Sequence, residues 1–177
     1  MTDEAAPGDA ASRRLTDPAA TVQVGERLAG LVRGGDAIAL IGDLGAGKTT
    51  LVTGLVAALG GGTAASPTFS LINEYPGGRL VVWHVDLYRI ERAAELPELG
   101  LDDVIGDPRG ICVIEWADRF AVLPADHLRI ELAHVAADSP AEAAGDVDRG
   151  RRLVATGHGP RGRALAAELL RSIEGDR

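Results

Sequence analysis

Cysteine, long apolar runs and aromatic residues are scarce or missing in this sequence of 177 residues. No apolar run approaches the roughly 20 residues that a membrane-spanning helix needs. The single cysteine, Cys112, cannot form a disulfide within the chain. Residues 1–11 include three acidic side chains and lack the basic and then apolar pattern of a secretory signal. We therefore expect a protein of the reducing cytoplasm that does not enter a membrane.

Positive charge is also in short supply. The chain carries 18 basic and 26 acidic residues, a formal net charge of −8, and only 3% of its residues are aromatic. A phosphate backbone repels such a chain, and few rings are present on which bases could stack, so tight non-specific binding of nucleic acid is not expected. Lysine is nearly absent, because Lys48 stands alone beside 17 arginines. This bias is typical of a GC-rich genome, and the one retained lysine indicates a chemical role.

The order of apolar segments predicts an α/β fold. Residues 1–13 are small, acidic and interrupted by Pro and Gly, which predicts a disordered tail, and residues 14–177 are expected to form one domain. Apolar runs predict strands at residues 37–41, 69–75, 80–85, 111–114, 128–132 and 153–155. Helical spacing predicts helices from Pro18 to Gly34, from the glycine loop to Gly60, in short pieces over 90–104, and over 160–173. Strands that alternate with helices favour a three-layer α/β/α arrangement around a mixed, mainly parallel sheet, in which the hairpin at 69–85 is antiparallel.

One motif carries specific chemistry. Residues 42–49 read GDLGAGKT and match the pattern G-x-x-x-x-G-K-[ST] in full, after an apolar run and before a helical pattern. The glycines let the backbone turn tightly, so that successive N–H groups and the following helix N-terminus point at phosphate oxygens. Lys48 would reach the β- and γ-phosphates, and the Thr49 hydroxyl could bind Mg²⁺. The predicted nucleotide contacts are Gly42, Leu44, Gly45, Ala46, Gly47, Lys48, Thr49 and Thr50.

Two carboxylates follow predicted strands. Asp86 ends the run at 80–85, and Glu115 ends the run at 111–114. Carboxyl ends of parallel strands meet at one edge of a sheet, where a P-loop enzyme needs an acidic group near Mg²⁺ and the attacking water. The spacing alone leaves open which carboxylate binds metal and which positions water.

Several motifs together resemble a known family. The segments GDLGAGKTT (42–50), SPTF (66–69), HVDLYR (84–89) and ELPELG (95–100), followed by Glu115-Trp116, occur in this order over about residues 15–130. In this order and spacing they resemble the bacterial TsaE family, also called YjeE, the P-loop ATPase of tRNA threonylcarbamoyladenosine (t6A) biosynthesis. The resemblance implies a compact P-loop NTPase-like domain that binds ATP and Mg²⁺ and is a weak ATPase. It also implies TsaD and TsaB homologues as partners, which carry out the transfer to tRNA, so that this chain would meet tRNA indirectly.

The resemblance assigns roles to individual residues. It implies that Lys48 and Thr49 hold phosphates and Mg²⁺, and that Glu115 is the second protein ligand of Mg²⁺. It implies that Asp86 is required for hydrolysis, so Lys48, Asp86 and Glu115 form the expected catalytic set.

Four further positions follow from the same resemblance. Thr68 would lie in a switch-like segment near the γ-phosphate, and Trp116 would lie in a second one. Asp17, at the start of the first helix, and Arg149, in the late strand region, would border the nucleotide.

Two other functions remain open at the level of sequence. A small P-loop kinase would need an acceptor pocket and a lid with arginines, for which Arg149, Arg151 and Arg152 are candidates. A nucleotide-gated scaffold would use ATP only to order the segments at Ser66–Phe69 and Trp116. Phosphate release separates the ATPase from the scaffold, and a phosphorylated small molecule would indicate the kinase. The four histidines lack metal-ligand spacing and are expected to be structural or exposed.

Overall fold

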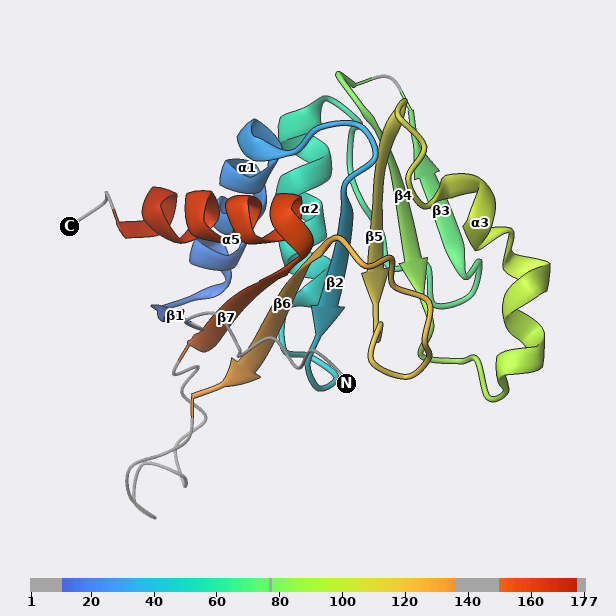
Figure 1. Cartoon of the computed structure of the whole chain (residues 1–177). Helices are drawn as coiled ribbons and strands as arrows, with labels where there is room; N and C mark the ends of the chain where they lie inside the picture. Colours follow the sequence, from blue (N-terminus) through green and yellow to red (C-terminus); the bar gives the residue numbers. More distant parts are fainter. Residues whose placement is uncertain (1–10, 77, 136–149, 175–177) are drawn as a thin grey trace, which may run out of the picture.

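Seven strands form one sheet that is packed between helices in the computed structural model, which describes residues 11–76, 78–135 and 150–174 (Figure 1). The strands are β1 (Ala11–Leu15), β2 (Ala37–Ile41), β3 (Ile72–Tyr75), β4 (Val81–Asp86), β5 (Gly110–Glu115), β6 (His127–His134) and β7 (Arg151–His158). The helices are α1 (Pro18–Leu31), α2 (Lys48–Leu59), the 3₁₀ helix η1 (Ala93–Leu99), α3 (Leu101–Val104) and α5 (Gly159–Glu174). None of these helices combines the length and apolarity needed to cross a bilayer.

The sheet order, β1-β7-β6-β2-β5-β4-β3, places four parallel strands at its centre. Strands β6, β2, β5 and β4 run parallel, whereas β3 pairs with β4, β7 with β6, and β1 with β7 in antiparallel fashion. The register sets Asp86 opposite Glu115 and Leu40 opposite Glu115. The predicted α/β fold with a mixed sheet is therefore confirmed, and both strand-end carboxylates lie beside the segment that follows β2.

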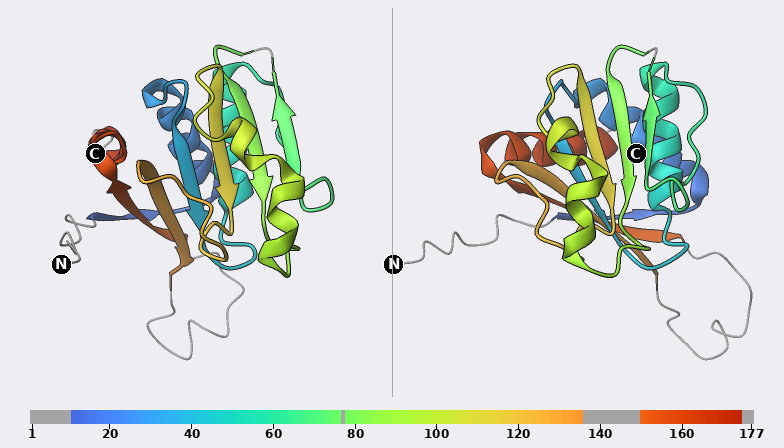
Figure 2. Two further views of the ribbon diagram at one scale, coloured as in Figure 1. Left: turned by 45° about the vertical axis from the view of Figure 1, so that its right-hand side comes forward. Right: turned by 90° about the vertical axis from the view of Figure 1, so that its right-hand side faces the viewer.

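Helices cover both faces of the sheet unequally (Figure 2). Helices α1, α2 and α5 enclose the larger core on one face, and η1, α3 and the segment after β5 cover a smaller core on the other. The side chains of β2 alternate between them, since Ile38 and Leu40 belong to the larger core and Ala39 and Ile41 to the smaller one. A strand buried on both faces has no polar side, which explains why residues 37–41 form a continuous apolar run.

Several predicted boundaries are wrong; β7, for example, spans Arg151–His158 where the sequence predicts 153–155, and two further cases have a clear physical reason. Strand β3 begins at Ile72, not at residue 69, because Pro67–Leu71 forms a turn in which Leu71 N–H donates to the Pro67 carbonyl at 2.6 Å and Leu71 has φ of 64°. The predicted tail extends through residue 13, but β1 begins at Ala11 and pairs with β7. That pairing joins opposite ends of the chain, so local composition carries no signal for it. Residues 1–10 lie outside the described residues.

Cys112 lies on β5 within the smaller core and is fully buried. Burial disfavours the charged thiolate and raises the pKa of this thiol to about 12. We expect a thiol-reactive reagent at pH 8 to modify Cys112 in the native protein on the order of 100-fold more slowly than in the urea-unfolded protein. Labelling at equal rates in the two states would contradict this placement.

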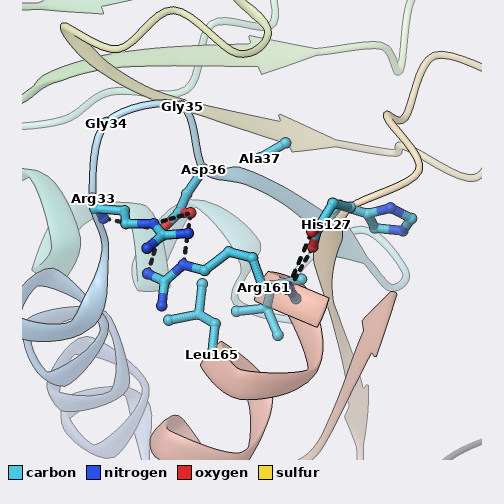
Figure 3. Close-up of a pocket in the computed structure, with 11 residues that line it drawn as sticks. Arg33, Gly34, Gly35, Asp36, Ala37, His127, Arg161 and Leu165 are labelled. Atoms are coloured by element: carbon cyan, nitrogen blue, oxygen red, sulfur yellow. Dashed lines mark hydrogen bonds and ion pairs between the residues drawn. The ribbon is translucent and has the colours of Figure 1, made fainter. Parts of the chain in front are cut away.

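An ion pair between buried Asp36 and partly buried Arg161 joins three elements at the amino ends of β2 and β6, beside a cavity of about 210 Å³ (Figure 3). Arg161 of α5 points at Asp36, with Nε 2.9 Å from Oδ1 and Nη2 2.6 Å from Oδ2. Arg161 Nη2 also donates to the Leu31 carbonyl at the end of α1, and Asp36 accepts from the backbone N–H of Arg33. The pair therefore fixes α5 and α1 to the start of β2.

The Asp36→Asn variant is expected to lose about 2 kcal/mol of unfolding free energy, because the partly buried Arg161 guanidinium would lose its charged hydrogen-bond acceptor. Urea denaturation measures this difference. The matched control is Glu131→Gln, which breaks a half-exposed pair with Arg129 and should cost less than about 1 kcal/mol. Equal stability of Asp36→Asn and the native protein would contradict this role.

Candidate functional site

The glycine loop between β2 and α2 has the geometry that its sequence predicts. Gly42, Gly45 and Gly47 all have positive φ, at 145°, 78° and 105°. A Cβ at Gly42 would lie 2.2 Å from the Leu132 carbonyl oxygen, so no other residue fits there. Gly47 is the N-cap of α2 and has no side chain with which to cap it. The first N–H groups of α2 are thus offered to an anion at the mouth of the loop.

A cavity of about 210 Å³ opens where the loop meets the carboxyl ends of β4 and β5. It is lined by Leu44, Gly45, Gly47, Lys48, Thr49, Thr50, Ser66, Thr68, Asp86, Tyr88, Glu115 and Trp116. Most of the predicted nucleotide contacts and both predicted strand-end carboxylates therefore share one cavity. Gly42 and Ala46 shape the loop without lining the cavity.

Lys48 is held at the floor of the loop, with only 4% of its surface exposed. Its Nζ donates to the carbonyls of Gly42 at 2.6 Å and Asp43 at 2.9 Å, and lies 4.0 Å from the centre of the Trp116 ring. Burial lowers the pKa of Lys48, while nearby acidic groups, Glu115 first among them, oppose that shift. A buried ammonium that donates to backbone carbonyls is costly, and a polyphosphate in contact with it would offset that cost.

Glu115 joins the end of β5 to the start of α2. Its Oε1 accepts hydrogen bonds from Thr49 Oγ1 at 2.7 Å and from His84 Nε2 at 2.8 Å. A threonine hydroxyl beside a buried carboxylate is a pair of hard oxygen donors of the kind that Mg²⁺ prefers, with phosphates and water completing its shell. In the described part of the chain, no group of three or more His, Cys, Asp and Glu residues could hold a metal by itself. The donor set therefore fits Mg²⁺ bound together with phosphates.

Asp86 is tied to the segment that contains Thr68. Its Oδ2 accepts from Thr68 Oγ1 at 2.9 Å, and its Oδ1 accepts from the Tyr88 backbone N–H at 2.9 Å. The Ser66 and Thr68 hydroxyl oxygens lie 2.6 Å apart. Any movement of residues 66–68 therefore changes the surroundings of a buried carboxylate in the cavity.

The rim of the cavity is aromatic and apolar. Trp116 follows Glu115 directly, has φ of 58°, and its ring centre lies 5.0 Å from that of Tyr88. Tyr88, Leu44 and Phe69 are the exposed large apolar side chains of the described residues; Tyr88 and Leu44 line the cavity, and Phe69, which is 89% exposed, follows the lining residue Thr68. Apolar groups that stand in water around a polar cavity are typical of a surface that another protein covers.

One predicted contact, Asp17, is not brought to the cavity, and another falls outside the described residues. Asp17 is the N-cap of α1, where its Oδ1 accepts from the Ala20 backbone N–H at 2.8 Å, and it does not line the cavity. The N-capping signal in the sequence is sufficient to explain this aspartate. Arg149 lies outside the described residues.

Two residues with clear contacts to the site were missed as site residues. Arg151 of β7 donates to the loop carbonyls of Ala46 at 3.2 Å and Gly45 at 3.4 Å, so it holds the loop and does not line the cavity as a lid arginine would. His84 Nε2 lies 2.8 Å from Glu115 Oε1. Neither contact has a local sequence signal, because each depends on which strands become neighbours.

A loop of this sequence between a buried parallel strand and a helix, faced by carboxylates from two neighbouring strands, defines the class of P-loop NTPases. Residues 15–141 match the family model for the threonylcarbamoyl adenosine biosynthesis protein TsaE. The chain belongs to the TsaE family, as its motifs predict.

Individual relatives agree with this assignment. The tRNA threonylcarbamoyladenosine biosynthesis protein TsaE of Bacillus subtilis is 36% identical over 160 residues, which cover 89% of this chain and 92% of that protein. The proteins of the same name from Nostoc and Streptomyces coelicolor are 41% and 37% identical, over 68% and 78% of this chain and 76% and 91% of theirs. The crystal structure of Bacillus subtilis YdiB superposes with a TM-score of 0.71 at 31% identity and covers 92% of this chain and 95% of that one.

Proposed function

We propose that this protein is the ATP-binding and ATP-hydrolysing component of the t6A modification machinery and that its hydrolysis supports turnover of a TsaB–TsaD complex. The observation that carries the proposal is the convergence of Lys48, Thr49, Asp86 and Glu115 on one cavity at the glycine loop. Residues 14–177 would act as a single domain, and the protein would work in the cytoplasm, where its tRNA target is modified.

Each group in the cavity has a part in hydrolysis. The loop N–H groups and the N-terminus of α2 would bind the β- and γ-phosphates, and Lys48 Nζ would turn from the loop carbonyls toward them. Thr49 and Glu115 would hold Mg²⁺, which when bound neutralises charge on the phosphates. Asp86 would orient the attacking water, whose oxygen forms a bond to the γ-phosphorus as the bond to ADP breaks and a proton passes to solvent.

Binding to partner proteins is supported by the rim of the cavity. Phe69 follows Thr68, which donates to Asp86, and the Tyr88 backbone N–H donates to the same carboxylate, so a protein that covered Phe69 and Tyr88 would alter the position of the segment at 66–68. The net charge of −8 disfavours direct capture of tRNA, which TsaB and TsaD homologues would contact instead.

The test is phosphate release from ATP and Mg²⁺ by the purified chain, alone and with the TsaB–TsaD pair. We expect weak release alone and a clear rise with the pair. Release that the pair leaves unchanged would contradict the proposal. If ATP labelled at the γ-phosphate passed its label to a small molecule and released no phosphate, the protein would be a kinase. Binding of ATP with no consumption would indicate a scaffold.

A further inference from the structure

His84 is a buried residue that contacts Glu115, which lines the cavity, but does not line the cavity itself. It precedes Asp86 by two residues on β4, so both side chains lie on the same face of the sheet. That face is the one covered by α2, because Val82, two residues earlier, belongs to the larger core. His84 is 0% exposed and does not line the cavity. It therefore cannot touch a nucleotide and can act only through a neighbour.

The two ring nitrogens of His84 differ, because one has a hydrogen-bond partner and the other has none among the described residues. Nε2 lies 2.8 Å from Glu115 Oε1, and since a carboxylate only accepts, the imidazole donates there. Nδ1 is buried and has no hydrogen-bond partner among the described residues. Leaving a buried polar atom unpaired costs about 1–3 kcal/mol, a penalty that an apolar side chain of similar size would avoid. Packing alone thus gives no reason for a histidine at this position, whereas the contact with Glu115 does.

Glu115 is held from two sides. The His84 imidazole and the Thr49 hydroxyl donate to the same oxygen, Oε1, from β4 and from α2. A carboxylate that receives two donors in a buried site has a fixed orientation. Groups that orient a metal ligand in this way raise metal affinity, and their loss typically lowers it by about 10- to 100-fold.

We propose that His84 is a positioning residue, whose Nε2–H orients the Glu115 carboxylate for Mg²⁺ binding. The inference rests on the proposed function, because it concerns the Mg²⁺ that would accompany the bound nucleotide. It goes further by placing a buried histidine, which the sequence shows only as one letter of HVDLYR, in the support of the metal ligand.

The test compares His84→Gln with His84→Met in the full chain. The two side chains have nearly the same length, but only Gln carries an N–H donor that can reach the position of Nε2. Calorimetry gives the dissociation constant of a non-hydrolysable ATP analogue in excess Mg²⁺ and in EDTA. The constant in EDTA divided by the constant in Mg²⁺ measures how much the Mg²⁺ site strengthens binding. We expect His84→Met to reduce that ratio by about tenfold or more and His84→Gln to restore most of it.

Two controls separate positioning from support of the fold. The dissociation constant in EDTA should be the same in the native protein and in His84→Met. Thermal unfolding should show that His84→Met still folds cooperatively, because loss of the unpaired Nδ1 offsets part of the cost of taking one donor from the buried Glu115 carboxylate. In a Glu115→Ala background, His84→Met should change the ratio no further, since the group it orients is absent.

Each contrary result has a defined meaning. Equal constants in Mg²⁺ and EDTA for the native protein would overturn the Mg²⁺ site and with it the role of His84. If the ratio of the two dissociation constants were the same in His84→Met and in the native protein, the role of His84 alone would be overturned. Failure of His84→Met to fold, or equal weakening in Mg²⁺ and EDTA, would assign the histidine to the fold and overturn the inference.

Discussion

Replacing Lys48 with methionine is expected to weaken ATP binding by at least about 100-fold, which corresponds to about 3 kcal/mol. The two side chains have similar length, so the change removes the charge with little change in shape. Lys48 is the only lysine, its Nζ stands at the floor of the loop, and burial lowers its pKa. A polyphosphate would bring charged oxygens into direct contact with this buried ammonium, whose hydrogen bonds go to backbone carbonyls. Calorimetry with ATP and Mg²⁺ measures the loss.

The matched control is Arg92→Met. It removes the same unit of charge from η1, at a side chain that is 81% exposed and outside the cavity. We expect this control to bind ATP as the native protein does, because exposed charges far from a ligand are screened by salt. If Lys48→Met bound ATP as tightly as Arg92→Met, the loop would not be the phosphate site.

Replacing Glu115 with alanine, or Asp86 with asparagine, is expected to lower ATP hydrolysis on the order of 100-fold or more. Both variants should still bind nucleotide in EDTA, because the loop backbone and Lys48 are unchanged. Glu115→Ala should in addition lose the effect of Mg²⁺ on binding, whereas Asp86→Asn should retain it. The reason is that, of these two carboxylates, Glu115 is the one that accepts from the Thr49 hydroxyl. Phosphate release and calorimetry together distinguish the two roles.

Glu131→Ala is the control for these carboxylates. Glu131 lies on the parallel strand on the other side of β2, opposite Ile41, and does not line the cavity. Its loss should leave hydrolysis at the native rate. Full turnover by Glu115→Ala would refute its assignment as the metal ligand, and full turnover by Asp86→Asn would refute the assignment of the water-orienting group.

Local patterns predict the centre of the fold well and its edges poorly. Residues 37–59 combine a fully apolar run, a glycine loop and a largely apolar helix, and each of these signals lies within a few neighbouring residues. Strand β1 depends on a partner at the other end of the chain, so the sequence predicts its first three residues, 11–13, as the end of the tail. The early end of β3 is wrong for a different reason, because a turn with a strained leucine, Leu71, replaces the expected strand.

The difference between local and distant contacts also decides which parts of the site could be predicted from the sequence. The loop motif is contiguous, so most of the loop residues that line the cavity could be predicted from it. Asp86 and Glu115 could be placed together only because parallel strands end at one edge, and the register confirms that they are opposite each other. The contacts of His84 and Arg151 could not be predicted, since each reaches a group on another strand or loop. The resemblance suggested Asp17 as a contact, but its carboxylate caps a helix.

The most direct test of the central claim is tRNA modification over many rounds, in a mixture of TsaB, TsaD, tRNA, the threonylcarbamoyl donor, ATP and this protein. The claim is that ATP hydrolysis at the loop resets the transfer complex. Modified tRNA should therefore accumulate beyond the first round with the native protein and stop there with Glu115→Ala. Equal accumulation with the native protein and Glu115→Ala would contradict a role for hydrolysis in turnover.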